Sequence, residues 1–303
     1  MGKFIDSSRR QYAPVGECIY CGSRHDLRRE HIIPQSLGGS WVLPKSTCEV
    51  CAGITRDFEQ DVARKMFSAL RHQFGFPSST HKKRGGVRSV RLTIKKSGST
   101  VTEDFPAHDM PVLPVLMPTY KAPGILFNGP PNIVFSRQMT ALVWHPPEDQ
   151  RQRGSIREQL VTPDVTDIFH HMIIPQAAFC RMLAKIAHAA TIAHYGLGAA
   201  PSILADYILG KNPHLPYVVG GTTMQCRNLP DSLHWGVEFG THDRGDQRFL
   251  TVKIELFRFL FLQGIKGGRG PVYWITVCPA DQRLVELSAN GPQYPLDHKK
   301  QRS

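Results

Sequence analysis

Two pairs of cysteines near the N-terminus have the spacing of a metal site. Cys18 and Cys21 form one Cys-x-x-Cys pair, and Cys48 and Cys51 form a second. Two such pairs, separated by a segment long enough to fold back, suit a tetrahedral zinc ion. A redox role is the alternative, but it would use one pair beside a βαβ pattern, which this sequence lacks. The cysteines therefore predict a structural zinc that supplies folding free energy to a short module.

An acid–histidine pair lies between the two cysteine pairs. Glu30 and His31 are soon followed by Pro34 and by Gly38-Gly39, a pattern that predicts a short strand running into a loop. At a kink there, the two adjacent side chains could converge. A histidine is the natural general base near neutral pH, and a carboxylate can hold a divalent cation. The pair therefore indicates hydrolysis of a phosphodiester, and the alternative is a surface pair without a role.

The order of these motifs resembles the HNH endonucleases. Residues 18–59 contain, in this order, Cys-x-x-Cys, Glu-His-Ile-Ile-Pro, Gly-Gly and a second Cys-x-x-Cys. The segment 181–187 looks like the family's C-terminal companion helix. The resemblance implies a ββα-metal fold braced by a four-cysteine zinc. It also implies DNA as the substrate, His31 as the general base and Glu30 as a ligand of a catalytic Mg²⁺ or Mn²⁺. The products would carry a 5′ phosphate and a 3′ hydroxyl.

One position departs from the family pattern. Many members have Asn or His directly after the second cysteine pair as a further metal ligand, and this chain has Ala52. On a helix after that pair, Thr55, Arg56 and Glu59 share the face of Ala52. Thr55 or Glu59 could replace the ligand, and Arg56 could instead neutralise a phosphate. The departure leaves two other functions open: a catalytically inactive, zinc-dependent nucleic-acid-binding module, or a protein-binding zinc scaffold.

Basic residues are concentrated in the first third of the chain. The net charge is +12, and the first hundred residues hold eighteen Lys and Arg against eight Asp and Glu. Such an excess is typical of a polyanion partner, here DNA, although a solvated surface is the alternative. The residues expected to contact the phosphate backbone are Arg28, Arg29, Arg56, Lys82, Lys83, Arg84, Arg91 and Lys95. We find no recognition helix, so we expect no sequence preference.

The rest of the pattern predicts an α+β protein in three parts. These are a zinc-braced HNH module over 1–75, a basic hairpin and Pro/Gly-rich connection over 76–158, and a C-terminal α+β domain with antiparallel strands over 159–303. Hydrophobic periodicity predicts helices at 55–74 and 176–194, and strands at 90–95, 101–105, 233–239, 249–259 and 272–277. We expect 106–132 to lack regular structure, because prolines recur there.

Arg181, Lys185 and His188 lie at helical spacing and predict a solvent-facing stripe on a core-packing helix. The seven cysteines cannot all pair with one another, and the chain shows neither a signal-peptide pattern nor an apolar run of membrane-spanning length. We therefore expect a cytoplasmic protein with reduced thiols. The sequence carries no indication of its oligomeric state.

Overall fold

The computed structural model describes ten segments of the chain. They are residues 10–76, 89–106, 110, 113–127, 139–144, 162–198, 202–211, 218–225, 235–257 and 269–281.

The cysteine pairs and the acid–histidine pair belong to one small α+β unit. Its sheet has the order β1-β3-β2, with β1 (Arg10–Gln11) parallel to β3 (Trp41–Thr47) and β2 (Arg28–His31) antiparallel to it. A short 3-10 helix, η1 (Gln35–Leu37), lies in the loop that joins β2 to β3. The predicted short strand before a loop is therefore confirmed. Two helices follow the sheet, α1 (Glu49–Lys65) and α2 (Ser68–Gln73).

The helix predicted over 55–74 is wrong in its bounds. Helix α1 begins six residues earlier, because Cys48 with its extended backbone is the N-cap residue and the second cysteine pair forms the first turn. The chain also breaks between Lys65 and Ser68. The apolar positions that suggested one helix are nevertheless all buried: Phe58, Val62, Met66, Leu70 and Phe74.

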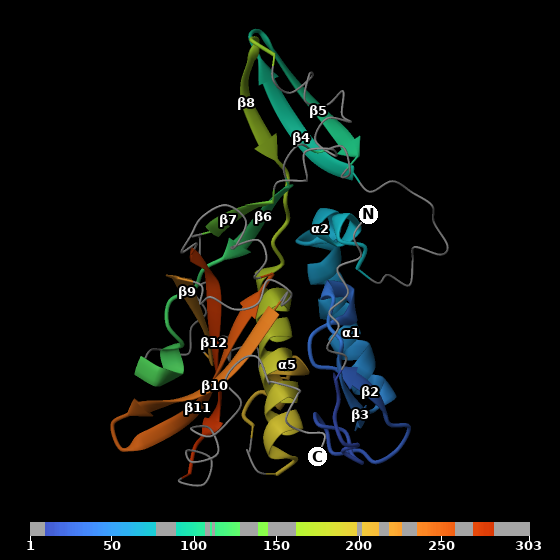
Figure 1. Cartoon of the computed structure of the whole chain (residues 1–303), viewed down its shortest axis with the longest axis vertical. Coiled ribbons are helices and arrows are strands. Elements are labelled where there is room, and N and C mark those ends of the chain that lie inside the picture. Colours follow the sequence, from blue (N-terminus) through green and yellow to red (C-terminus); the bar gives the residue numbers. More distant parts are fainter. Residues whose placement is uncertain are drawn as a thin grey trace, which may run out of the picture.

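A three-stranded sheet projects from the rest of the protein (Figure 1). It contains β4 (Ser89–Lys96), β5 (Ser99–Pro106) and β8 (Val165–His170) in the order β5-β4-β8, all antiparallel. The predicted hairpin is confirmed. Strand β8 was not predicted, because its residues are mostly exposed and lack the alternation of a half-buried strand.

The proline-rich connection contains regular structure, so the expectation for 106–132 is wrong. Strand β6 (Leu113–Pro118) pairs with β7 (Met139–Trp144), and a 3-10 helix, η2 (Gly124–Phe127), follows β6. Prolines are tolerated in β6 because each strand of a two-stranded ribbon has a free edge.

The C-terminal part contains the predicted helix and an antiparallel sheet. Helix α5 (Gln176–Tyr195) is followed by the short α6 (Ala205–Ile208). Strands β9 (Val219–Gln225), β10 (Trp235–Arg244), β11 (Gln247–Leu256) and β12 (Arg269–Pro279) pair in the order β10-β11-β12-β9. In the described residues, no helix is long and apolar enough to cross a membrane.

Helix α5 lies between this four-stranded sheet and the small N-terminal unit (Figure 1). It contacts β9, β11 and β12 and also α1. Because it has neighbours on both sides, the stripe predicted to face solvent is instead inside: Lys185 is fully buried and His188 is 3% exposed. These contacts, and the pairing of β4 with β8, run across the predicted domain boundaries.

Candidate functional site

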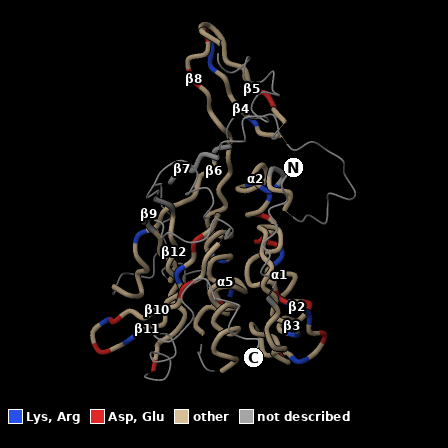
Figure 2. The backbone as a smooth tube through the Cα atoms, in the orientation of Figure 1, with Lys and Arg blue, Asp and Glu red and all other residues tan. Residues whose placement is uncertain are grey.

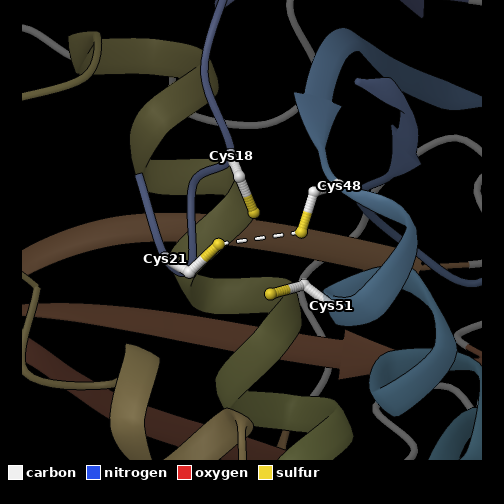
Figure 3. A group of neighbouring side chains, drawn as sticks. All are labelled: Cys18, Cys21, Cys48 and Cys51. Atoms are coloured by element: carbon white, nitrogen blue, oxygen red, sulfur yellow. Dashed lines mark hydrogen bonds between the residues drawn. The ribbon is translucent and has the colours of Figure 1, made fainter. Parts of the chain in front are cut away.

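The four cysteines come together as a metal site (Figure 3). Cys18 and Cys21 lie in the loop before β2, and Cys48 and Cys51 lie at the start of α1. All four sulfur atoms are within 4.8 Å of one another, and the Sγ atoms of Cys21 and Cys48 are 3.6 Å apart. Among the described residues, this is the one group of three or more His, Cys, Asp or Glu with such geometry. The prediction that the two pairs converge is confirmed.

Two thiols of this cluster, those of Cys21 and Cys51, are costly to ionise without a cation, because burial raises the pKa of each. Burial, and then the neighbouring thiol of Cys21, raises the pKa of Cys51 above its ordinary value. A metal ion reverses this balance, because it binds the thiolate form. The cluster is therefore suited to hold a metal and to release protons as it does so.

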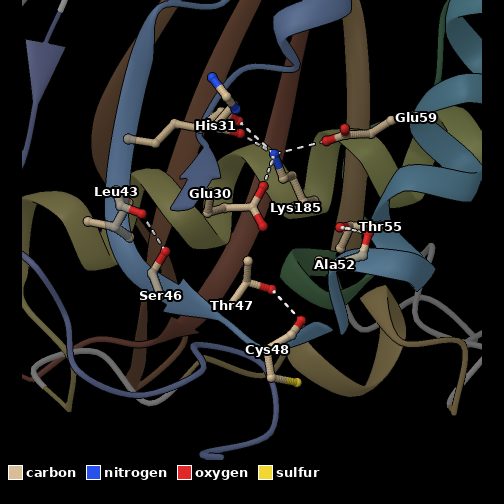
Figure 4. A network of polar contacts seen from close by, with 11 residues as sticks. Glu30, His31, Leu43, Ser46, Thr47, Cys48, Ala52, Thr55, Glu59 and Lys185 are labelled. Atoms are coloured by element: carbon tan, nitrogen blue, oxygen red, sulfur yellow. Dashed lines mark hydrogen bonds and ion pairs between the residues drawn. The ribbon is translucent and has the colours of Figure 1, made fainter. Parts of the chain in front are cut away.

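Glu30 and His31 occupy successive positions on the edge strand β2. Glu30 pairs with Leu43 and His31 with Val42, and the register irregularity lies earlier, between Arg28 and Glu30. Successive residues on a strand point to opposite faces. Glu30 is buried and His31 is partly exposed, and Figure 4 shows the imidazole directed away from the Glu30 carboxylate. The expected convergence of the two side chains at a kink is therefore not seen.

The loop after this pair holds the strands at close distance. A Cβ atom on Gly39 would lie 2.0 Å from the carbonyl oxygen of Ile33, so only glycine fits there. The amide nitrogen of Ile32 donates to the carbonyl oxygen of Trp41 at 3.0 Å, which closes β2 against β3. The Gly-Gly sequence therefore lets the chain return directly and fixes the position of the acid–histidine pair.

The partner of Glu30 is a lysine from α5. The Nζ atom of Lys185 lies 2.6 Å from Oε1 of Glu30 and 2.9 Å from Oε1 of Glu59, and it also donates to the main-chain carbonyl oxygen of His31 (Figure 4). Burial by itself would lower the pKa of Lys185, but Glu30 and Glu59 together raise it above its ordinary value. Lys185 is therefore a charged group in the interior, and its role as the partner of Glu30 was not predicted from the sequence.

Glu59, the substitute ligand suggested by the sequence, lies on α1 across from Glu30. Its side chain is 19% exposed. Burial raises the pKa of Glu59; Lys185 opposes this shift and Glu30 adds to it. The other suggested substitute, Thr55, uses its hydroxyl to donate to the carbonyl oxygen of Ala52 at 3.3 Å. Thr55 is therefore committed to its own helix.

These residues do not fit a divalent metal as they are arranged. Carboxylate oxygens are the donors that Mg²⁺ and Mn²⁺ prefer. However, the space between Glu30 and Glu59 holds an ammonium group, and Ala52 supplies no third ligand. Outside the cysteine cluster, the described residues contain no other group of three ligand side chains within 4.8 Å.

Two neighbours of Lys185 on α5 also contact the N-terminal unit. The guanidinium of Arg181 lies over the ring of Phe58 on α1, 4.7 Å from its centroid. The Nε2 atom of His188 is 2.7 Å from the carbonyl oxygen of Ile19, the residue after Cys18. Burial lowers the pKa of His188 to about 4, so the ring is neutral and donates this bond. The three polar residues thus contact α1, β2 and the first cysteine loop.

Three of the eight basic residues expected to contact DNA are paired with acids. Arg28 pairs with Glu49, and Arg56 lies 3.8 Å from the same carboxylate. On the projecting sheet, Arg91 pairs with Asp104 at 2.7 Å. Figure 2 shows basic and acidic positions interleaved on β4, β5 and β8. The described part of this sheet is therefore not a continuous basic face.

Of the other five basic residues expected to contact DNA, the structure describes Arg29 and Lys95. Arg29 is exposed on β2, and the Nζ atom of Lys95 lies 4.8 Å from the centroid of the Phe169 ring. Lys82, Lys83 and Arg84 lie outside the described residues.

Comparison with known proteins assigns the N-terminal unit to a family. Residues 18–68 match the family model described as HNH endonuclease. This segment is an HNH endonuclease domain. The match runs from Cys18 to the start of α2, so it includes Glu30, His31 and Glu59 and leaves out Lys185. No curated protein and no solved structure matches the chain. The HNH domain indicates nuclease-type activity on a nucleic acid.

Proposed function

We propose that the HNH domain is a DNA endonuclease with His31 as its general base. The observation that supports this most directly is the setting of His31: its imidazole is partly exposed on an edge strand, while its main-chain carbonyl is held by Lys185. A general base has to be reachable by water and fixed in position, and this histidine meets both conditions.

In the proposed reaction, the imidazole of His31 takes a proton from a water molecule. The hydroxide attacks the phosphorus, the bond to the 3′ oxygen breaks, and that oxygen takes a proton from a solvent water molecule, which gives a 5′ phosphate and a 3′ hydroxyl. Four cysteine thiolates suit zinc, which would brace the unit and take no part in the chemistry. Mg²⁺ or Mn²⁺ at Glu30 remains the expectation from the HNH resemblance, with Glu59 as the possible substitute for the ligand lost at Ala52. Binding there requires Lys185 to leave, so no step is routed through such an ion.

The basic residues around this site would hold the duplex by its phosphates. Arg29 is exposed next to the acid–histidine pair, and Arg28 and Arg56 lie on adjoining elements with half of each side chain exposed. Lys82, Lys83, Arg84, Arg91 and Lys95 extend the proposed contact. Phosphate contacts make binding salt-dependent and carry no sequence preference.

A second candidate is a zinc-dependent nucleic-acid-binding module without catalysis. The position of Lys185 between Glu30 and Glu59 favours it, because the acid that would hold a catalytic cation is already paired. The partly exposed His31 argues against it, since binding alone has no need of a general base.

Nicking of supercoiled plasmid by the full-length protein distinguishes the two functions. Wild type, His31→Ala and His25→Ala are compared with Mg²⁺, with Mn²⁺ and with EDTA, after zinc content has been matched. His25 is the control, because it is an exposed histidine of the same domain. We expect His31→Ala to lose at least about a hundredfold in rate and His25→Ala to remain active.

Two results would contradict the proposal. Cleavage by His31→Ala at the wild-type rate would remove His31 as the base. Salt-sensitive DNA binding by the wild type without nicking under any of the three conditions would make the binding module the better account.

A further inference from the structure

We propose that Lys185 is the resident cation of the Glu30–Glu59 pair. Its ammonium group takes the place that a divalent metal would need, and it fixes α5 to the HNH domain. The inference rests on the contacts of three side chains, so it does not depend on whether the domain cleaves DNA.

The ammonium group is matched to its surroundings. A lysine ammonium has three hydrogens to donate. Two carboxylate oxygens form ion pairs with it, Oε1 of Glu30 at 2.6 Å and Oε1 of Glu59 at 2.9 Å. Two main-chain carbonyl oxygens accept hydrogen bonds from it, that of His31 and, at 3.4 Å, that of Ile32. Four oxygen atoms therefore surround the ammonium group, as expected of a built site.

Burial makes this match necessary. Lys185 is fully buried and Glu30 is 6% exposed. A buried charge is strongly unfavourable unless an opposite charge and hydrogen bonds compensate it. Lys185 supplies both to Glu30, so the acid is neutralised without any ion from solution.

The same contacts exclude a divalent cation. An ion bound to the oxygens of Glu30 or Glu59 would lie within about 5 Å of Nζ, because Mg²⁺ binds oxygen at about 2.1 Å. Even with the screening of bulk water, repulsion at that distance weakens binding by at least about tenfold, and a protein interior screens less. Lys185 and a metal therefore compete for one position.

A second lysine in the chain provides a matched control. Lys253 on β11 also lies between two glutamates, 3.2 Å from Glu238 and 3.0 Å from Glu255. It belongs to the C-terminal sheet and its side chain is 16% exposed. Its removal also leaves two carboxylates without their lysine, but away from the HNH domain.

Binding of Mn²⁺ to the zinc-loaded, full-length protein, followed by electron paramagnetic resonance, tests the proposal. We compare wild type, Glu30→Gln, Lys185→Met, the double variant of these two, and Lys253→Met. Wild type and Glu30→Gln should bind Mn²⁺ alike. Lys185→Met should gain a site at least about tenfold tighter, which the added Glu30→Gln removes. Lys253→Met should gain no site that depends on Glu30.

Two results of this comparison would overturn the proposal. One is a Mn²⁺ site in the wild type that Glu30→Gln abolishes. The other is a folded Lys185→Met protein that binds no additional Mn²⁺.

A measurement on the wild type covers the case in which Lys185→Met does not fold. Acetylation of each lysine by an activated ester is followed by mass spectrometry, with and without millimolar Mn²⁺. Lys185 should react far more slowly than the exposed Lys65 under both conditions. Reaction of Lys185 that Mn²⁺ accelerates would show that the metal displaces the ammonium, and it would overturn the proposal.

Discussion

Replacement of Lys185 by methionine should destabilise the protein strongly. Methionine keeps the length of the apolar stem, so the change removes mainly the ammonium group. Glu30 and Glu59 lose their common cation, and the carbonyl oxygen of His31 loses a donor. Breaking a buried ion pair by removal of one partner costs about 3–5 kcal/mol, because the remaining charge is left in the interior. A typical domain has 5–15 kcal/mol of stability, so the variant should still fold.

Urea unfolding of the zinc-loaded protein, followed by tryptophan fluorescence, measures this cost. Trp41 on β3 and Trp235 on β10 pack edge to face with centroids 4.6 Å apart, so their emission reports whether the HNH domain remains against the C-terminal sheet. Lys65→Met is the control. Lys65 pairs with Asp61 on the exposed side of α1, and its loss should cost no more than about 0.5 kcal/mol.

A second substitution separates charge from packing. Adding Glu59→Gln to Lys185→Met removes one of the two stranded carboxylates and should recover part of the lost stability. If Lys185→Met costs less than about 1 kcal/mol, or if Glu59→Gln recovers nothing, the buried ion pairs do not hold α5 to the HNH domain, and the reasoning is refuted.

Three further outcomes are expected. Cys51→Ser should lose the bound zinc, measured by mass spectrometry of the metal, and with it the helical circular dichroism of the HNH domain. His188 has a pKa of about 4 when folded and 6.5 when unfolded, so protonation of the unfolded chain should remove up to about 3 kcal/mol of stability as pH falls from 6.5 to 4. His188→Gln should flatten that slope in urea titrations at each pH. Gly39→Ala should destabilise the domain by more than about 2 kcal/mol because its Cβ would overlap main-chain atoms, whereas Gly53→Ala, with open space in α1, should stabilise it by up to about 1 kcal/mol in thermal unfolding. Equal effects of the two alanines would contradict the steric argument.

The spacing of residues along the sequence correctly predicted the cysteine cluster and the helix α5, because both depend on short-range geometry. The first cysteine pair needs only a short turn, in which Gly22 has φ +74°. A strand then returns the chain so that the second pair lies beside the first. Helix α5 was predicted to within a residue because its apolar period continues without a break. In α1, by contrast, the first turn contains the polar Glu49 and the regular apolar spacing begins only at Phe58, so periodicity placed the start too late.

The polar side of α5 could not be predicted in the same way. Hydrophobic periodicity assigns a charged residue to solvent, and Lys185 departs from this rule only because Glu30 and Glu59 receive it. Those acids precede it by more than 120 residues in the sequence. A lysine whose partners are so distant gives no local indication of burial. The same separation explains why Glu30, Glu59 and the companion helix were identified one by one and not as one cluster.

The contacts of α5 indicate that the HNH domain is completed by a helix outside its family match. Arg181, Lys185 and His188 follow one side of α5 and contact three separate parts of the domain: the ring of Phe58, the acid pair, and the loop of the first cysteine pair. The last two of these contacts pair buried polar groups, the ammonium of Lys185 with the Glu30 carboxylate and the imidazole of His188 with the carbonyl oxygen of Ile19. Because the acid beside His31 is neutralised from α5, the charge around the proposed general base is set by the C-terminal part of the chain. Any motion of α5 would therefore change the electrostatics of the proposed active site directly, without a relay through intervening residues.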